Sequence, residues 1–143
     1  MGIASVSAYP DACILIYLVE DRVHWSHQIR QRLQPEHGPL PTLVFTELTR
    51  LECRLHPLKT GNTLALNAFD RFFATSGYSY QALDRPVFES ATQLRAQYGL
   101  KTPDALHLAA AINAGCDEFW TNDQRLAKAA QNRLRIVTFE STP

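Results

Sequence analysis

The sequence predicts an α/β fold, a three-layer α/β/α sandwich with a central, mostly parallel sheet of about five strands. Short apolar segments alternate along the chain with longer segments in which apolar residues recur at helical spacing. Strands separated by helices are joined by crossovers, which produce a parallel sheet with helices on its faces. With 143 residues, 45% hydrophobic and 20% charged, the chain fits one globular domain, 1–143.

The expected strands are short segments, most of them rich in β-branched or aromatic residues. They are 4–9, 42–46, 78–83, 118–121 and 135–139. One helix is expected directly after Asp11. The other expected helices cover 25–33, the residues from about 48 toward Pro57, a segment capped by Asn62, then 86–98, a segment from Thr102 to Gly115, and 124–130. Thr102 is expected as the cap of its helix, with Pro103 in the first turn. Residues 34–41, with three prolines and a glycine, predict a loop.

Charge and composition exclude several classes of protein. Fourteen basic and fourteen acidic side chains balance, so no global positive field would draw the protein onto nucleic acid or anionic lipid. The longest apolar run, Ala12–Val19, is shorter than the ~20 residues that cross a bilayer, so we expect no membrane association. Three cysteines lie far apart without a C-x-x-C pair, which indicates a reduced, cytoplasmic protein.

Acidic side chains follow the predicted strands. Asp11 and Asp123 each come shortly after a strand, and Glu47 and Glu52 follow another. Asp104 lies in the first turn of the helix that starts at Thr102. Because the carboxyl ends of parallel strands share one edge of the sheet, these acids are expected to meet there.

Each acid also has an ordinary structural interpretation. Asp104 suits the positive end of a helix dipole, Asp123 or Asn122 could be an ordinary N-cap, and Asp11 could cap the helix that follows it. The spacing from Thr49 to Glu52 matches a capping box. Taken together, however, acids gathered at one edge repel each other and lose hydration unless a cation neutralises them. The joint pattern therefore favours a site for a hard divalent cation.

Other kinds of site have weaker support. The six glycines form neither common phosphate-binding loop, and no nucleophile elbow of the G-x-S-x-G type is present. His107 lies one turn beyond Asp104 and could join a metal site, but the better interpretation is a histidine on the flank of the helix. The pair His24 and His27 is expected on a solvated helix face.

Four segments carry a resemblance to a known family. They are DACILIY from Asp11, TELTRLE from Thr46 to Glu52, TPDALHLA from Thr102, and CDEFWTND from Cys116 to Asp123. In this order over nearly the whole chain they resemble PIN-domain ribonucleases, specifically the VapC-like toxins of type II toxin–antitoxin modules. The resemblance selects Asp11, Glu52, Asp104 and Asp123 as the acidic quartet and leaves Glu47 outside it.

The resemblance implies an endoribonuclease that uses Mg²⁺ or Mn²⁺ and leaves a 5′-phosphate and a 3′-hydroxyl. Asp11 and Asp104 are then expected to bind the principal ion directly, while Glu52 and Asp123 bind a second ion or orient water. Thr121 is expected to contact the attacked phosphate. Such chemistry needs an activated water and positive charge beside the phosphate, which divalent ions supply.

The implied partners are an RNA, an antitoxin and a second copy of the chain. Arg50 and Arg54, one helical turn apart, are candidate RNA contacts with Lys59 and Arg125 nearby in sequence, although helix-surface solvation explains them equally well. A neutral protein suits one structured RNA, such as a tRNA or rRNA, cut at an unpaired loop. The antitoxin is expected to place an amphipathic segment in a groove beside the acids.

Two rival functions remain open from the sequence. A phosphatase or phosphoryl-acceptor domain also places acids at strand ends, but it would require a second Asp where Cys13 stands. A catalytically silent PIN-like module that binds RNA or protein is the other alternative, which the intact acidic quartet disfavours.

Overall fold

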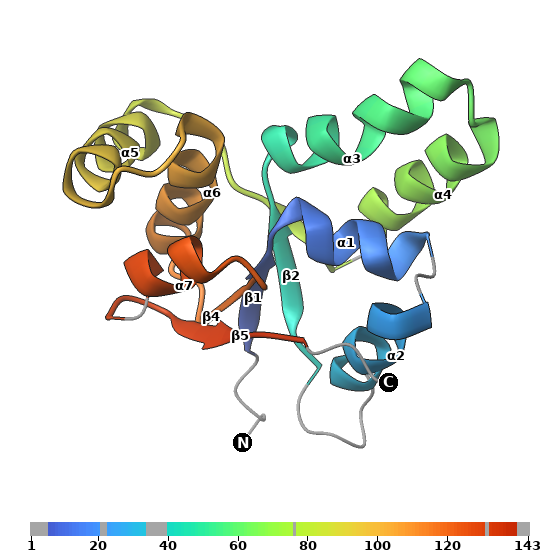
Figure 1. Ribbon diagram of the computed structural model, residues 1–143, viewed down its shortest axis with the longest axis horizontal. Helices are drawn as coiled ribbons and strands as arrows, with labels where there is room; N and C mark the ends of the chain where they lie inside the picture. The colour runs from blue at the N-terminus through green and yellow to red at the C-terminus, as the bar shows by residue number, and fades with distance from the viewer. Residues whose placement is uncertain (1–5, 21–22, 34–39, 76, 131, 140–143) are drawn as a thin grey trace.

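A computed structural model describes residues 6–20, 23–33, 40–75, 77–130 and 132–139 (Figure 1). Within these residues the sheet has five strands, all parallel, in the order β3-β2-β1-β4-β5. The strands are β1 (Ser7–Pro10), β2 (Thr42–Phe45), β3 (Ser79–Tyr80), β4 (Glu118–Trp120) and β5 (Arg135–Val137). The predicted parallel five-stranded sheet is confirmed.

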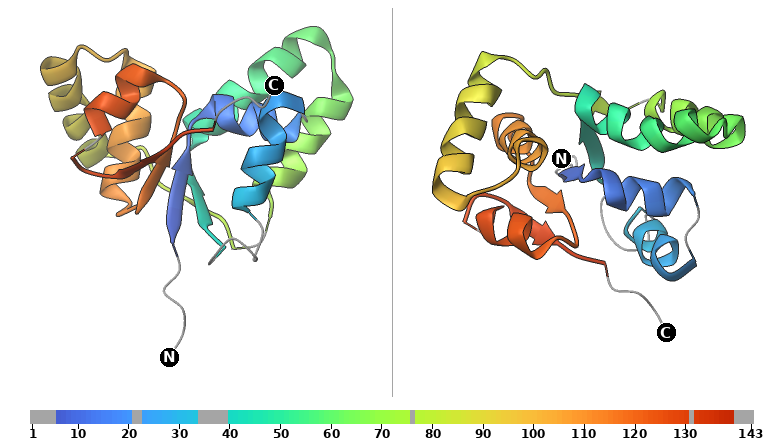
Figure 2. Two further views of the ribbon diagram at one scale, coloured as in Figure 1. Left: turned by 60° about the horizontal axis from the view of Figure 1, so that its bottom comes forward. Right: turned by 45° about the horizontal axis from the view of Figure 1, so that its top comes forward.

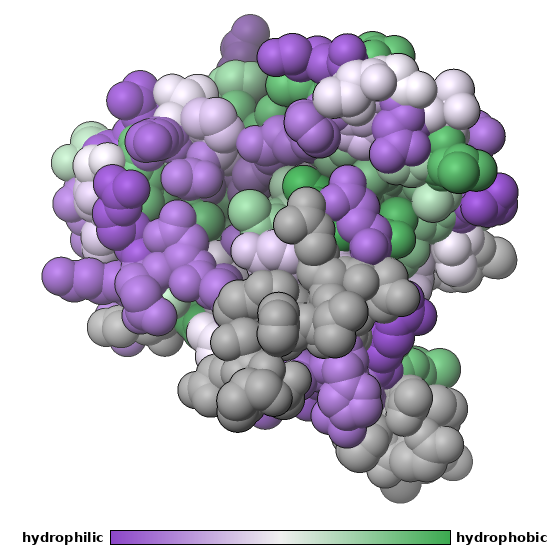
Figure 3. Space-filling model, turned by 45° about the vertical axis from the view of Figure 1, so that its right-hand side comes forward, coloured by the Kyte–Doolittle hydropathy of each residue, from purple (hydrophilic) through white to green (hydrophobic). Residues whose placement is uncertain are grey.

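Helices cover both faces of the sheet, as the sequence predicts (Figure 2). One face carries α1 (Ala12–Val19), α2 (Val23–Arg32), α3 (Glu47–Thr60) and α4 (Thr63–Phe73), and the other carries α5 (Arg85–Tyr98), α6 (Thr102–Asn113) and α7 (Gln124–Ala130). Polar side chains dominate the face shown in Figure 3, with apolar residues in small patches between them.

The strand side chains alternate between two hydrophobic cores because successive residues of a strand point to opposite faces. Tyr9, Val44 and Phe119 pack with α5, α6 and α7. Their neighbours Leu43 and Trp120 pack with α1 to α4 on the opposite face. This alternation directs the Tyr9 side chain toward α6, which bears on the site described below.

Several predicted boundaries are wrong. Helix α3 continues past Pro57 to Thr60, and β3 contains only two residues. Thr102 is the first residue of α6 and Lys101 is its N-cap, without a side-chain hydrogen bond. Gly115 does end α6, since its backbone adopts φ 71° and its N–H donates to the carbonyl of Ile112.

Some expectations fall on residues outside the description. These are the start of the first strand at 4–5, most of the expected loop at 34–41, and the side chains of His24 and Trp25. In the described part of the chain, no helix combines the length and apolar character needed to span a bilayer.

The order of the strands locates the functional edge. From β1 the chain proceeds to β2 and β3 on one side, and it later returns to β4 and β5 on the other. In an open parallel sheet such a reversal leaves a crevice outside the carboxyl ends of the central strands. Here that crevice lies beyond β1 and β4, where Asp11 and Thr121 follow.

Candidate active site

The four acids of the predicted quartet line one cavity of about 300 Å³. Asp11 follows β1, Glu52 lies on α3, Asp104 on α6, and Asp123 precedes α7. The other lining residues are Ala12, Cys13, Tyr17, His107, Asn122 and Leu126. Side chains more than 110 positions apart in the sequence thus face a shared hollow at the crevice.

Asp11 is buried and held on both carboxylate oxygens. Its Oδ1 accepts a hydrogen bond from the backbone N–H of Ile14 at 3.1 Å, which caps α1. Its Oδ2 accepts one from the Thr121 hydroxyl at 2.5 Å, and that hydroxyl accepts from the Asp123 N–H at 3.0 Å. Burial nevertheless raises the pKa of Asp11 above its ordinary value, against the lowering effect of these hydrogen bonds.

Asp104 lies in the first turn of α6, partly buried and close to the carboxylate of Asp123. Partial burial raises its pKa above the ordinary value, and the nearby carboxylate of Asp123 raises it further. The positive end of the α6 dipole and the charges of His107 and Lys101 act in the opposite direction. A cation bound in the cavity would add to them by favouring the charged form of Asp104.

Asp123 caps α7 and also lines the acidic cavity. Its Oδ1 accepts from the N–H of Arg125 at 2.9 Å and its carbonyl accepts from the N–H of Ala127, so it caps α7. The same residue lines the acidic cavity. Capping fixes this side chain relative to the cavity.

The capping-box interpretation of Glu52 is wrong. Thr46 is the N-cap of α3, and it exchanges the two capping hydrogen bonds with Thr49. Glu52 lies in the next turn, where one carboxylate oxygen bonds to Nε2 of His107. Its side chain is 33% exposed and reaches the cavity from the α3 side.

His107 is not on a helix flank, so the preferred interpretation of this residue was wrong. It is 3% exposed, and its ring lies between Glu52 and the hydroxyl of Tyr9, which is 2.7 Å from Nδ1. The sequence held a signal for this, because the run Ala105–Ala111 is apolar apart from the histidine. The structure buries every residue of that run. A histidine inside a run that is apolar all around belongs to a buried helix, where it requires partners.

The remaining candidates lie outside the acidic cavity or beneath its surface. Arg50 and Arg54 both reach Asp70 on α4, at 3.5 and 2.9 Å, and with Glu47 they line a different cavity. Thr121 is fully buried, and its hydroxyl donates to Asp11. A direct contact of Thr121 with a substrate phosphate stays a prediction, while its contact with Asp11 fixes a carboxylate.

The donor set of the cavity fits a hard divalent cation. Within the described ranges, no three His, Cys, Asp or Glu side chains already form a metal cluster. Mg²⁺ needs no such cage, because it usually binds through one or two carboxylates and keeps several waters. Burial raises the pKa of both Asp11 and Asp104, and a cation bound between them would favour their charged forms.

Comparison with known proteins agrees with this geometry. The family model of the PIN domain matches residues 8–132. The chain belongs to the PIN domain family. By sequence, no curated protein matches it.

Solved structures share the fold of this PIN domain over most of its length. VapBC2 from Rickettsia felis, bound to a promoter DNA fragment, superposes with a TM-score of 0.72 at 13% identity, covering 94% of this chain and 100% of that chain. VapC20 from Mycobacterium tuberculosis, a toxin described as cleaving the sarcin-ricin loop, gives 0.70 at 12% identity over 86% and 95%. A toxin–antitoxin complex from Klebsiella pneumoniae gives 0.61 at 25% identity over 92% and 97%.

Proposed function

We propose that this PIN domain is a Mg²⁺- or Mn²⁺-dependent endoribonuclease, the toxin of a toxin–antitoxin pair, that cuts a structured cellular RNA such as a tRNA or rRNA. The observation that supports it is the cavity into which Asp11, Glu52, Asp104 and Asp123 converge. The similarity of the fold to toxin structures, one of them described as cleaving the sarcin-ricin loop, is consistent with this proposal.

Each carboxylate has a part in the proposed reaction. Asp11 and Asp104 hold the principal ion, and Glu52 and Asp123 hold a second ion or orient the attacking water. When bound, the ion supplies a water of lowered pKa and positive charge beside the scissile phosphate. Thr121 keeps Asp11 oriented through the hydroxyl contact described above.

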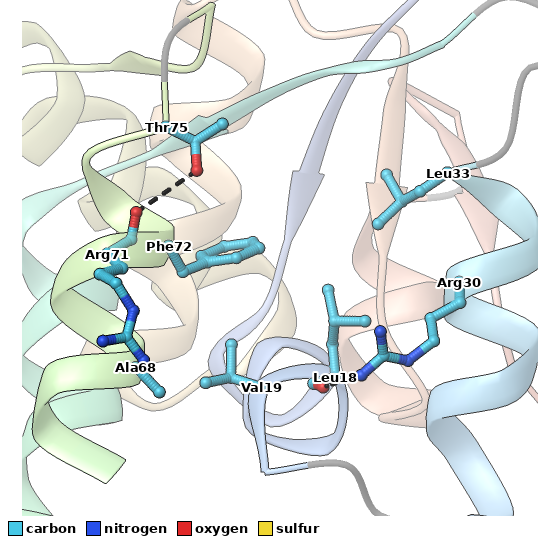
Figure 4. Close-up of a pocket in the computed structure, with 8 residues that line it drawn as sticks. All are labelled: Leu18, Val19, Arg30, Leu33, Ala68, Arg71, Phe72 and Thr75. Atoms are coloured by element: carbon cyan, nitrogen blue, oxygen red, sulfur yellow. Dashed lines mark hydrogen bonds between the residues drawn. The ribbon is translucent and has the colours of Figure 1, made fainter. Parts of the chain in front are cut away.

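The antitoxin has a candidate binding surface at the far end of α1. A cavity of about 600 Å³ opens between α1, α2 and α4, lined by Leu18, Val19 and Leu33 together with Arg30, Ala68, Arg71, Phe72 and Thr75 (Figure 4). Apolar side chains and the guanidinium of Arg71 suit an amphipathic helix with acidic residues beside its apolar face. One length of α1, about 12 Å, separates this groove from Asp11.

A homodimer also has a candidate surface. Leu51, Leu55 and Leu58 are 58%, 53% and 62% exposed on one face of α3. Glu47 and Arg54 line the same cavity as these leucines. A two-fold contact across this face would bury the same leucines of both copies against each other. Sedimentation of the purified protein tests the association.

One assay tests the proposed function. Protein purified free of antitoxin is incubated with total RNA and Mn²⁺, with and without chelator. We expect cuts that the chelator abolishes and that Asp104→Asn reduces by several orders of magnitude, while Asp84→Asn, on the cap of α5, cuts normally. Equal cutting by Asp104→Asn would remove the metal hypothesis, and no cutting under any condition would favour the catalytically silent module.

A further inference from the structure

A chain of buried polar groups connects the start of α3 to Glu52. The hydroxyl of Tyr9 lies 3.2 Å from the hydroxyl oxygens of both Thr46 and Thr49 and 2.7 Å from Nδ1 of His107. Nε2 of the same imidazole meets the Glu52 carboxylate. Tyr9, Thr46 and Thr49 are all fully buried, so each polar atom must be satisfied within this network.

An ionised carboxylate only accepts, so the contact with Glu52 places a hydrogen on Nε2 of His107 and gives the network a direction. The backbone N–H groups of Thr46 and Thr49 donate to each other's hydroxyl oxygens, which leaves both hydroxyl hydrogens free to donate elsewhere. Both can donate to the Tyr9 oxygen, which has two lone pairs. The Tyr9 O–H then donates to Nδ1 of His107, and the neutral imidazole carries its hydrogen on Nε2.

We infer that His107 is a positioning residue that holds the Glu52 carboxylate at the acidic cavity, with its Nε2–H tautomer fixed by the Tyr9 hydroxyl. This inference rests on the proposed nuclease function, and it adds a residue to the machinery of the site. His107 contacts Glu52 from the buried side and contributes no ligand of its own.

Glu52 needs such a partner more than the other acids do. Asp11 is fixed by the Ile14 N–H and the Thr121 hydroxyl, and Asp123 by the Arg125 N–H. Glu52 lies in the interior of α3, where the backbone N–H groups are already bonded within the helix. Its longer side chain has one more rotatable bond, so fixing it costs more conformational entropy. The imidazole supplies that ordering in advance.

A double-mutant cycle tests whether His107 positions the Glu52 carboxylate or only packs in the hydrophobic core. His107→Leu removes both nitrogens at similar volume, whereas His107→Gln keeps an N–H near the position of Nε2. We expect His107→Leu to lower the single-turnover RNA cleavage rate about 10- to 100-fold in Mn²⁺, as loss of a group that orients a ligand does, and His107→Gln to recover most of it. In the Glu52→Gln background, the leucine change should add no further loss, because His107 acts through Glu52.

Contrary outcomes are equally specific. A folded His107→Leu protein that cuts at the wild-type rate overturns the inference, as does an equal loss in the presence and absence of the Glu52 carboxylate. If His107→Leu fails to fold, Tyr9→Phe takes its place in the cycle, since it removes only the hydroxyl that fixes the tautomer. Wild-type protein that cuts no RNA removes the proposed function itself, which is a distinct result.

A spectroscopic measurement is independent of catalysis. The ¹⁵N resonances of the His107 ring in the metal-free protein should show a hydrogen on Nε2 and a bare Nδ1. In Tyr9→Phe the share of the Nδ1–H tautomer should rise, because nothing then donates to Nδ1. A wild-type ring with its only hydrogen on Nδ1 would reverse the deduced direction and overturn the inference.

Discussion

Thr121 and Asp11 show how a catalytic carboxylate is fixed before any ion binds. The Thr121 hydroxyl donates to Asp11 Oδ2 and accepts from the Asp123 N–H, so one buried side chain joins two members of the quartet. Its donated hydrogen bond also lowers the pKa of Asp11, opposing the effect of burial. Removal of this hydroxyl should therefore affect the site more than the fold.

We predict that Thr121→Val lowers RNA cleavage about 10- to 100-fold, because Asp11 loses a donor that orients it. Thr121→Ser keeps the hydroxyl and should retain most of the activity. The rates are measured with Mn²⁺ and an RNA cut by the wild-type protein. Wild-type activity in a folded Thr121→Val protein would show that Asp11 is held without this contact.

Asp104 gives a prediction about pH. Because its pKa is higher in the folded protein, the folded state binds the proton more tightly than the unfolded state does. The stability gained from this proton is fully present below the unfolded pKa of about 3.9 and is lost as the pH rises through the folded pKa. With chelator present, Asp104→Asn should therefore melt above the wild-type protein at neutral pH, and the difference should shrink on acidification.

Melting temperatures measured from neutral pH down to about pH 4 check the prediction. Asp84→Asn is the control, and it should not melt above the wild-type protein at neutral pH. A lower melting temperature of metal-free Asp104→Asn at neutral pH would contradict the inference that the folded protein destabilises the charged form of Asp104. It would instead restore the interpretation in which Asp104 mainly serves the helix dipole.

At the scale of elements, α6 begins without a side-chain cap. Lys101 occupies the N-cap position, where Ser, Thr, Asp or Asn would accept a hydrogen bond from the first turn. We predict that Lys101→Asn raises the free energy of unfolding by about 0.5–2 kcal/mol. Lys101→Ala separates this effect from loss of the lysine charge near Asp104 and should give no such gain. Thermal unfolding in chelator measures both variants, and equal stability of the two would contradict the capping argument.

The sequence predicted elements well where one local signal decides them. Asn62 does cap α4, Gly115 does follow α6, and α7 has the expected bounds, because turn and cap chemistry act over a few residues. The cap of α6 was misplaced by one residue because Thr102 is a good cap by type, yet Pro103 is equally suited to the second helical position.

For the site, the sequence predicted the acids but not the residues that position them. The residue types and their places after strands predicted the quartet, and the family resemblance separated Glu52 from Glu47. The roles of Tyr9 and His107 escaped prediction because their partners lie 98 and 55 positions away in sequence. Only the strand order and the buried packing of α6 bring these groups together.

At the scale of the whole molecule, one buried carboxylate ties three elements on the flank of the sheet. Glu118 of β4 is fully buried and bonds to Arg32 of α2 at 2.5 Å, to Arg135 of β5 at 2.7 Å and to the Trp120 indole at 3.0 Å. Burying a carboxylate is unfavourable unless it is paired. The two arginines therefore hold α2 and β5 in place while they compensate Glu118.

We predict that the double change Arg32→Met and Arg135→Met destabilises the fold by about 1–3 kcal/mol, since it leaves the buried Glu118 carboxylate with the Trp120 indole as its remaining hydrogen-bond donor. Adding Glu118→Gln should recover much of this loss, because it removes the stranded charge. Chemical denaturation of the double and triple variants gives the comparison. A triple variant less stable than the double variant would contradict this prediction, since it would show that the charge of Glu118 does not destabilise the double variant.

The proposed function depends on acids from separate parts of the chain forming one cation site. Anomalous diffraction from crystals grown with Mn²⁺ tests this most directly. We predict a manganese peak within coordination distance of carboxylate oxygens of both Asp11 and Asp104, and no peak there in crystals of Asp104→Asn. A fully hydrated cavity without manganese, or manganese bound only elsewhere on the protein, would contradict the account.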